Sequence, residues 1–187
     1  MKEVENILRI LKETLEAVKT ENASKIRELS NQTTNTASLT QDPDNIAVAV
    51  IVYSIGKILE RKDYRKLKGW NLFYNTIVTF LKKTIEDIQK NQPEKFRNDF
   101  KIIQKAINKL SGKLKKYIQE VFRAAKINKA SRLYAHGLSM EQTAKLLGIT
   151  VYELAEYAGQ TGIPEMPFSK TLSAKERIKL AVSFFEK

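Results

Sequence analysis

The sequence predicts an all-α protein, and three observations support this fold class. Apolar residues recur at spacings of three and four along most of the 187 residues, which is the period of one helix face. Seven Gly and four Pro are few for a chain of this length, whereas a β-rich fold would need more turns. Helix-start signals, such as a capping side chain followed by proline, precede several of these segments.

The first predicted helix begins at Val4 and continues to about Leu29. Its apolar positions alternate between spacings of four and three, which is a heptad seam: Val4, Leu8, Leu11, Leu15 and Val18. This seam fits an ordinary bundle helix or a coiled coil that forms a homodimer. We expect residues 30–40 to be a loop, because their Ser, Thr and Asn side chains compete for backbone hydrogen bonds.

The most apolar stretch, residues 46–55, predicts a central helix. Its β-branched run would also suit a buried strand, but Asp42 and Pro43 form a helix-start signal and no partner strands are evident elsewhere. A third helix places Trp70, Phe73 and Phe80 on one face, where we expect them to be core residues. The fourth helix begins at 92–93, again with proline in its first turn.

Residues 96–136 form an unusually long and regular helical segment, with a break or kink at Ser111-Gly112. Between Lys101 and Arg132 the chain has ten basic residues and a single acid, Glu120. This stretch therefore holds most of the net charge of +12. Compared with the apolar seam, the basic positions fall on the outer faces of the helix. Such a stripe attracts nucleic-acid phosphates, although a solvated helix face would look the same.

Several functional classes are disfavoured by composition. The chain has no Cys and one His, which excludes disulfides and thiolate metal sites and leaves too few residues for a histidine site. We find no Gly-rich phosphate loop or nucleophile elbow, and we expect no cofactor. The amphipathic N-terminus and the shortness of the apolar stretch predict a cytoplasmic protein that does not enter a membrane.

Residues 130–163 hold the most information about function. Gly137 can end one helix, and Ser139 then caps a new helix with a glutamine three residues on. Gly148 ends that helix, and Thr150 caps the next one with a glutamate three residues on. The predicted arrangement is a helix after Ser139, a tight turn at Gly148 and a second helix after Thr150. This is the spacing of a helix-turn-helix.

The residues at 137–150 carry a family resemblance. Gly137-Leu138-Ser139 followed by Thr-Ala-Lys-Leu-Leu-Gly-Ile-Thr at 143–150 resembles the helix-turn-helix superfamily of prokaryotic regulators. The extension through 157–164 is similar to small antitoxin-type modules of that superfamily, and the whole chain resembles an uncharacterised archaeal all-helical family. The resemblance implies a module that contacts DNA or a protein partner, but superfamily membership alone does not fix the function.

The second helix of this module, at 151–158, departs from the pattern of DNA readers. Its outward candidates are Tyr152, Glu153 and Glu156, and it contains no Arg or Lys. DNA readers usually present Arg, Lys, Gln or Asn to base edges from this helix. The preceding basic helix is therefore the better candidate for phosphate contact.

The sequence thus predicts a helical bundle at 1–126, a helix-turn-helix module at 127–165, and a linker with a final docking helix at 166–187. The leading hypothesis is a non-catalytic protein that binds DNA or RNA. Its predicted contact residues are Lys105, Lys109, Lys113, Lys116, Arg123, Lys126, Lys129, Arg132, Ser139, Thr150 and Tyr152.

Two other hypotheses remain open. The chain could be a protein-interaction or assembly module, with the N-terminal seam or the second helix of the module as the partner surface. An enzyme hypothesis rests on Arg132 and His136, which resemble the Arg and His pair of helical ribonuclease toxins, although the spacing in that family is wider. A lone His near a helix end is more often a capping residue, so we expect no catalytic residues.

Overall fold

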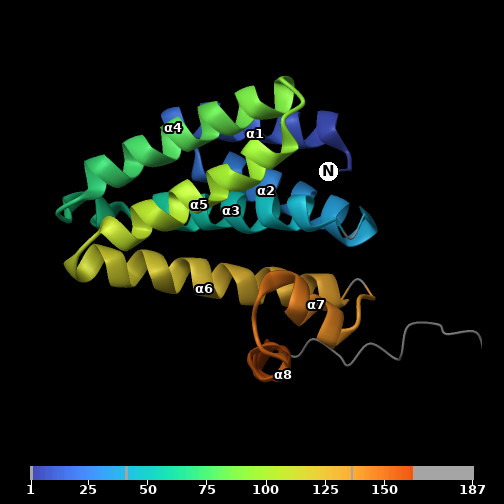
Figure 1. The fold of residues 1–187 in the computed structure, drawn as a ribbon. Helices are drawn as coiled ribbons and strands as arrows, with labels where there is room; N and C mark the ends of the chain where they lie inside the picture. The colour runs from blue at the N-terminus through green and yellow to red at the C-terminus, as the bar shows by residue number, and fades with distance from the viewer. Residues whose placement is uncertain (1, 41, 136, 162–187) are drawn as a thin grey trace, which may run out of the picture.

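A computed structural model describes residues 2–40, 42–135 and 137–161, and these residues form an all-α fold, as predicted (Figure 1). The elements in chain order are α1 (Val4–Lys19), α2 (Ala23–Thr40), α3 (Pro43–Glu60), a short 3₁₀ helix η1 (Lys62–Lys66), α4 (Trp70–Gln89), α5 (Pro93–Lys109), α6 (Gly112–Ala135), α7 (Met140–Leu147) and α8 (Val151–Thr161). In the described part of the chain, no helix is both long enough and apolar enough to span a bilayer.

The central helix is α3, as the sequence predicts. Asp42 caps it by accepting a hydrogen bond from the Asp44 amide at 2.8 Å, and Pro43 occupies the first turn. Val52, Ile55 and Ile58 are fully buried. Because α3 is apolar on nearly every side, it must be enclosed, and it packs against α1, α2, α6 and α7.

The prediction for residues 20–40 was only partly right, because residues 23–29 are helical as expected but residues 30–40 are not a loop. The first helix ends at Lys19, and α2 begins at Ala23 and includes the whole polar run that we expected to be a loop. The hydroxyls of this run bond to carbonyls of the preceding turn, as with Thr34 Oγ1 to Ser30 O (2.8 Å) and Thr40 Oγ1 to Thr36 O (2.9 Å). The hydroxyls of the threonines and of Ser38 are thereby satisfied inside a helix, which removes the physical reason for a loop.

Small side chains bring α2 close to α3. The buried positions of α2 after Leu29 are small residues at helical spacing: Ser30, Thr33, Thr34, Ala37 and Ser38. On the facing side of α3, a Cβ atom at Gly56 would lie only 3.2 Å from Ile26 Cγ2. Periodicity is therefore present in α2, but small residues carry it in place of large apolar ones.

The N-terminal seam is used inside the protein. Leu11, Leu15 and Val18 are buried where α1 packs against α2 and α4. These three residues therefore belong to the core, as in an ordinary bundle helix, whereas Val4 at the start of the seam is 42% exposed. The aromatic residues of α4 also lie in the core, with Phe73 and Phe80 each 2% exposed.

Helix α6 joins the bundle to the two last helices. The predicted break at Ser111-Gly112 is present, because α5 ends at Lys109 and α6 begins at Gly112. From there α6 is continuous to Ala135 and crosses the boundary that we predicted at 126. A second apolar cluster, which includes Val50, Ala130 and Leu154, holds α7 and α8 against α3 and α6. The predicted docking helix at 166–187 lies outside the described residues.

The close contact of α2 and α3 predicts a position-specific effect of valine. Gly56→Val should lower the free energy of unfolding by about 1–3 kcal/mol, because its methyl groups would overlap Ile26. The control is Gly159→Val in α8, where a Cβ atom meets nothing within 4 Å and the effect should stay within about 0.5 kcal/mol. Urea titration of both variants measures the difference. Equal effects would contradict the proposed packing.

Candidate nucleic-acid interface

The predicted basic stripe does not form one continuous surface. Lys105, Lys109, Lys113 and Lys116 lie around the junction of α5 and α6 and are exposed. The other four predicted cations, which include Arg123 and Lys129, lie on the second half of α6, next to α7 and α8. The two groups have different surroundings.

The first group belongs to a larger surface, which we call the basic end. It contains seven exposed lysines from η1, the η1–α4 loop, α5 and α6: Lys62, Lys66, Lys68, Lys105, Lys109, Lys113 and Lys116. Two contacts bring these elements together. Tyr64 of η1 stacks on Tyr117 of α6 at 5.3 Å, and a Cβ atom at Gly69 would lie 3.4 Å from Leu110 Cδ2.

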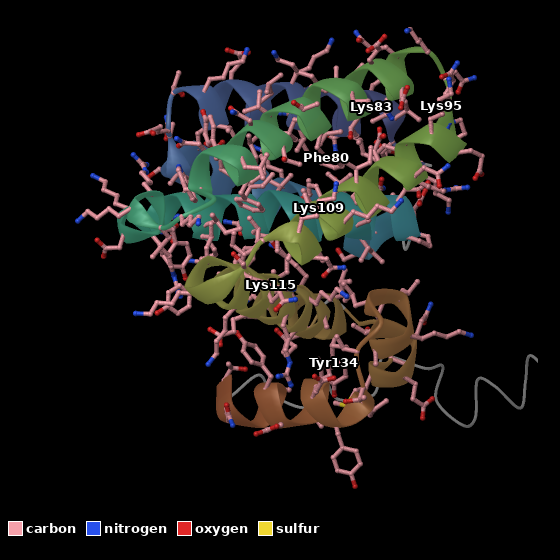
Figure 2. The ribbon with its side chains drawn as sticks, turned by 60° about the vertical axis from the view of Figure 1, so that its left-hand side comes forward. Phe80, Lys83, Lys95, Lys109, Lys115 and Tyr134 are labelled. Carbon is pink, nitrogen blue, oxygen red and sulfur yellow. The ribbon has the colours of Figure 1, made fainter. Side chains whose placement is uncertain are left out.

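The figures show the position of this surface. The turn from α5 to α6 and the start of α4 lie at the same end of the molecule, away from α7 and α8 (Figure 1). Lys109 and Lys115 lie toward this end, whereas Lys83 and Lys95 lie near the α4–α5 turn at the opposite end of those helices (Figure 2).

The charge of the basic end is poorly compensated. Lys66 pairs with Asp63 at 3.5 Å, and both side chains are more than four-fifths exposed, so this pair contributes little. The other six lysines have no ion pair with any described residue. Some lysines elsewhere on the surface do pair with neighbours, as Lys57 does with Glu60 and Lys19 with Glu16.

Helix dipoles explain only part of this arrangement. Lys109 lies in the last turn of α5, where a cation is favourable, and Lys115 Nζ donates to Asn108 O at 3.1 Å near the same helix end. Lys113, however, lies in the first turn of α6, which contains no acid. A cation there opposes the helix dipole, so a bound anion would relieve an unfavourable interaction.

On the second half of α6 most predicted contact residues already have partners. Arg123 donates from Nε and Nη2 to Glu153 Oε1 at 3.2 and 2.9 Å, which ties α6 to α8. Arg132 Nη1 donates to Asn31 Oδ1 at 3.2 Å. Both guanidinium groups remain exposed to solvent, but they hold helices together and are not free cations.

Lys129 was predicted as a phosphate contact, and this prediction was wrong. Its side chain is 1% exposed and points into the contact between α2, α3 and α6. The ammonium group donates to Thr34 Oγ1 at 2.8 Å and to Ser30 O at 3.3 Å, and it lies 4.6 Å from the centre of the Tyr53 ring. Burial, and secondarily the charge of Arg132, lower the pKa of Lys129 to about 7.

The heptad pattern of α6 could not show this burial, because Lys129 falls outside the apolar seam in sequence. The two oxygen atoms that accept from Lys129 belong to the polar run of α2, for which the sequence predicts a loop. Without a helix at 30–40, the sequence offers no buried acceptors for this lysine.

Helices α7 and α8 are joined by a tight turn at 148–150. Ser139 Oγ accepts from the Gln142 amide at 3.1 Å, and Thr150 and Glu153 cap each other through both amides at 3.0 and 3.1 Å. Both capping interactions were predicted, and they occupy the hydroxyls that we had also considered for nucleic-acid contact. Tyr152 remains free on the outer face of α8 and is 89% exposed.

Sequence reasoning missed three lysines of the basic end. Lys62, Lys66 and Lys68 precede α4, and five cations against one acid at 61–68 could have drawn attention to them. Only the turn after α3, however, brings this segment next to the start of α6. His136, the basis of the enzyme hypothesis, lies outside the described residues.

The described residues also contain no group of three or more His, Asp or Glu side chains that could hold a metal ion. Comparison with known proteins identifies no relative, because no family model, no curated protein and no solved structure matches the chain.

The environment of Lys129 predicts a specific dependence of stability on pH. The pKa is about 7 in the folded protein and near 10.5 when the side chain is solvated. Between these values the unfolded chain binds the additional proton, so the contribution of Lys129 to the free energy of unfolding rises with pH. Lys129→Met removes this group while keeping most of its volume.

We therefore expect Lys129→Met to be more stable than the unmodified protein near neutral pH. The advantage should shrink from about pH 7 to about pH 9, by at most roughly 1.4 kcal/mol per pH unit. Urea titrations of both proteins over this range measure it, and taking their difference cancels Tyr53 and the other groups that titrate in both. A stability difference that does not change with pH would contradict the buried, proton-losing lysine.

Proposed function

We propose that this protein binds nucleic acid without catalysis and that the basic end provides the phosphate contacts. One observation carries the proposal: six exposed lysines from η1, the following loop, α5 and α6 meet at one end of the molecule without a described acid partner. A surface made from several elements can follow a phosphate backbone, whereas a single helix face meets it over a shorter length.

The chemistry of the basic end favours contact with the backbone over reading of bases. The seven lysines of the basic end act as point charges, and the exposed Arg61 beside them donates from Nη1 to the hydroxyl of Tyr64 within the same segment. The outward face of α8 contains no cation that could read bases in its place. The expected binding is therefore electrostatic, steeply dependent on salt and weakly selective for sequence.

The helix-turn-helix interpretation of α7 and α8 fits this proposal only in a modified form. Arg123 pairs with Glu153 and so ties α8 to α6, while Glu153 also caps the N-terminus of α8 through Thr150. We propose that the module supports α6 and presents Tyr152, and that it does not place a recognition helix in the major groove.

A protein partner is the second candidate, and exposed apolar side chains favour it. Leu72 and Ile102 are 64% and 40% exposed and line a groove of about 290 Å³ between α4 and α5, beside Lys105 and Lys109. Tyr152 and Val151 form another exposed apolar pair on α8. An acidic partner segment with apolar side chains would fit the groove between α4 and α5.

The proposed function predicts which lysines matter. The quadruple variant Lys105→Gln, Lys109→Gln, Lys113→Gln and Lys116→Gln should bind a short DNA duplex or structured RNA much more weakly, because up to four phosphate contacts are lost. The slope of log affinity against log salt should fall by up to about three to four for duplex DNA. Fluorescence anisotropy at several salt concentrations measures both quantities.

The matched control removes the same charge elsewhere. Lys12, Lys82, Lys95 and Lys145 are also exposed and have no ion pair with a described residue, and all four are changed to Gln. We expect this control to retain most of the affinity and the salt slope. Equal losses of affinity in the two variants would show that binding depends only on net charge, which would contradict the assignment to the basic end. If the unmodified protein does not bind nucleic acid at low salt, the proposal is rejected in favour of a protein partner.

A further inference from the structure

A cleft of about 610 Å³ lies between α3, α5, α6 and the turn after α7. Helices α5 and α6 share the junction at 110–111 and diverge from it, and α5 contacts α6 much less than it contacts α4. The cleft occupies the wedge between them, with α3 as its floor and Ile149 at one end. Its volume is in the range of about 300–1,000 Å³ that is typical of small-molecule sites.

The walls of the cleft are apolar. Ile46 and Val50 of α3 form the floor, Phe100 and Ile107 of α5 form one wall, and Phe122 of α6 faces them. Phe100 and Phe122 are only partly buried, and both line the cleft. These five side chains offer no hydrogen-bond partner, so this part of the cleft favours a hydrocarbon chain.

The charged groups of the cleft come from α6 and α8. Arg123, Lys126 and Glu153 line it, and two amide side chains, Asn108 of α5 and Gln119 of α6, also line it. Arg123 contacts Glu153 through Nε and Nη2, which leaves Nη1 without a partner among the described residues. Lys126 is half-buried, and it too has no described hydrogen bond or ion pair.

The charges of these three side chains leave one positive charge at the mouth. Two cations and one carboxylate match a ligand with a single negative charge better than a phosphate monoester with two. The remaining N–H groups of Arg123 and Lys126 lie one helical turn apart on α6, where both can donate to the two oxygens of one carboxylate.

We propose that this cleft binds a fatty acid, with its acyl chain between α3, α5 and Phe122 and its carboxylate at Arg123 and Lys126. The site is distinct from the basic end, and it gives a role to two cations of α6 that lie away from that surface.

The test is a titration of the full chain with cis-parinaric acid, whose fluorescence rises in an apolar site. Parinaryl alcohol has the same chain without the charge. We expect saturable binding of one acid per chain and an affinity about ten-fold higher for the acid than for the alcohol, as expected for one charge-assisted hydrogen bond. Equal affinities for acid and alcohol, or no saturable binding, would overturn the proposal.

Two variants and one control test whether the fatty acid binds in the cleft. Lys126→Gln should weaken binding of the acid about ten-fold and leave the alcohol unchanged, whereas Lys145→Gln on α7, which does not line the cleft, should change neither. Ala47→Phe should weaken both ligands, because Ala47 is half-buried and a larger side chain there would fill the cleft. Circular dichroism verifies that each variant keeps its helices.

The same variants separate this inference from the proposed function. Ala47 is remote from the basic end, so Ala47→Phe should keep the affinity for nucleic acid while losing the fatty acid. Binding of the fatty acid that is unchanged in Ala47→Phe and lost only in the quadruple lysine variant would show attachment to the basic surface and would overturn the assignment of the cleft.

Discussion

The enclosure of α3 is the constraint on which the rest of the structure depends. A helix that is apolar on nearly every side must be covered by other helices, and α1, α2, α6 and α7 each cover part of it. Gly56 lets Ile26 of α2 approach α3 closely, and after Leu29 the buried positions of α2 are small residues. Most of these small residues carry hydroxyls, and Lys129 donates to the Thr34 hydroxyl and to the backbone carbonyl of Ser30.

This arrangement also divides the charge of α6. On the half of α6 near α7 and α8, Lys129 is buried and Arg123 and Arg132 bond to other helices, whereas Lys126 lines the cleft without a described partner. Toward α5 and η1, the lysines face solvent and gather with those that precede α4. A stripe that is uniform in sequence therefore has two different environments along one helix.

The sequence predicted the all-α class, the caps at Asp42, Ser139 and Thr150, and the break before Gly112, because these depend on local hydrogen bonds and apolar periodicity. It did not predict the break after Lys19 or the second half of α2, whose periodicity lies mainly in Ser and Thr, residues that also favour loops. The burial of Lys129 and the position of Lys62 and Lys68 beside α6 depend on tertiary contacts. No local pattern contains that information, so the candidate site was only half predicted.

The central claim is that the basic end, and not α8, faces the nucleic acid. Hydrogen–deuterium exchange of the full chain with and without a short nucleic-acid ligand tests it most directly, because it maps the contact without mutation. The account predicts slower exchange in η1, the first turn of α4 and the α5–α6 junction, and no change in α8. Slower exchange confined to α7 and α8 would contradict it and would favour insertion of a recognition helix.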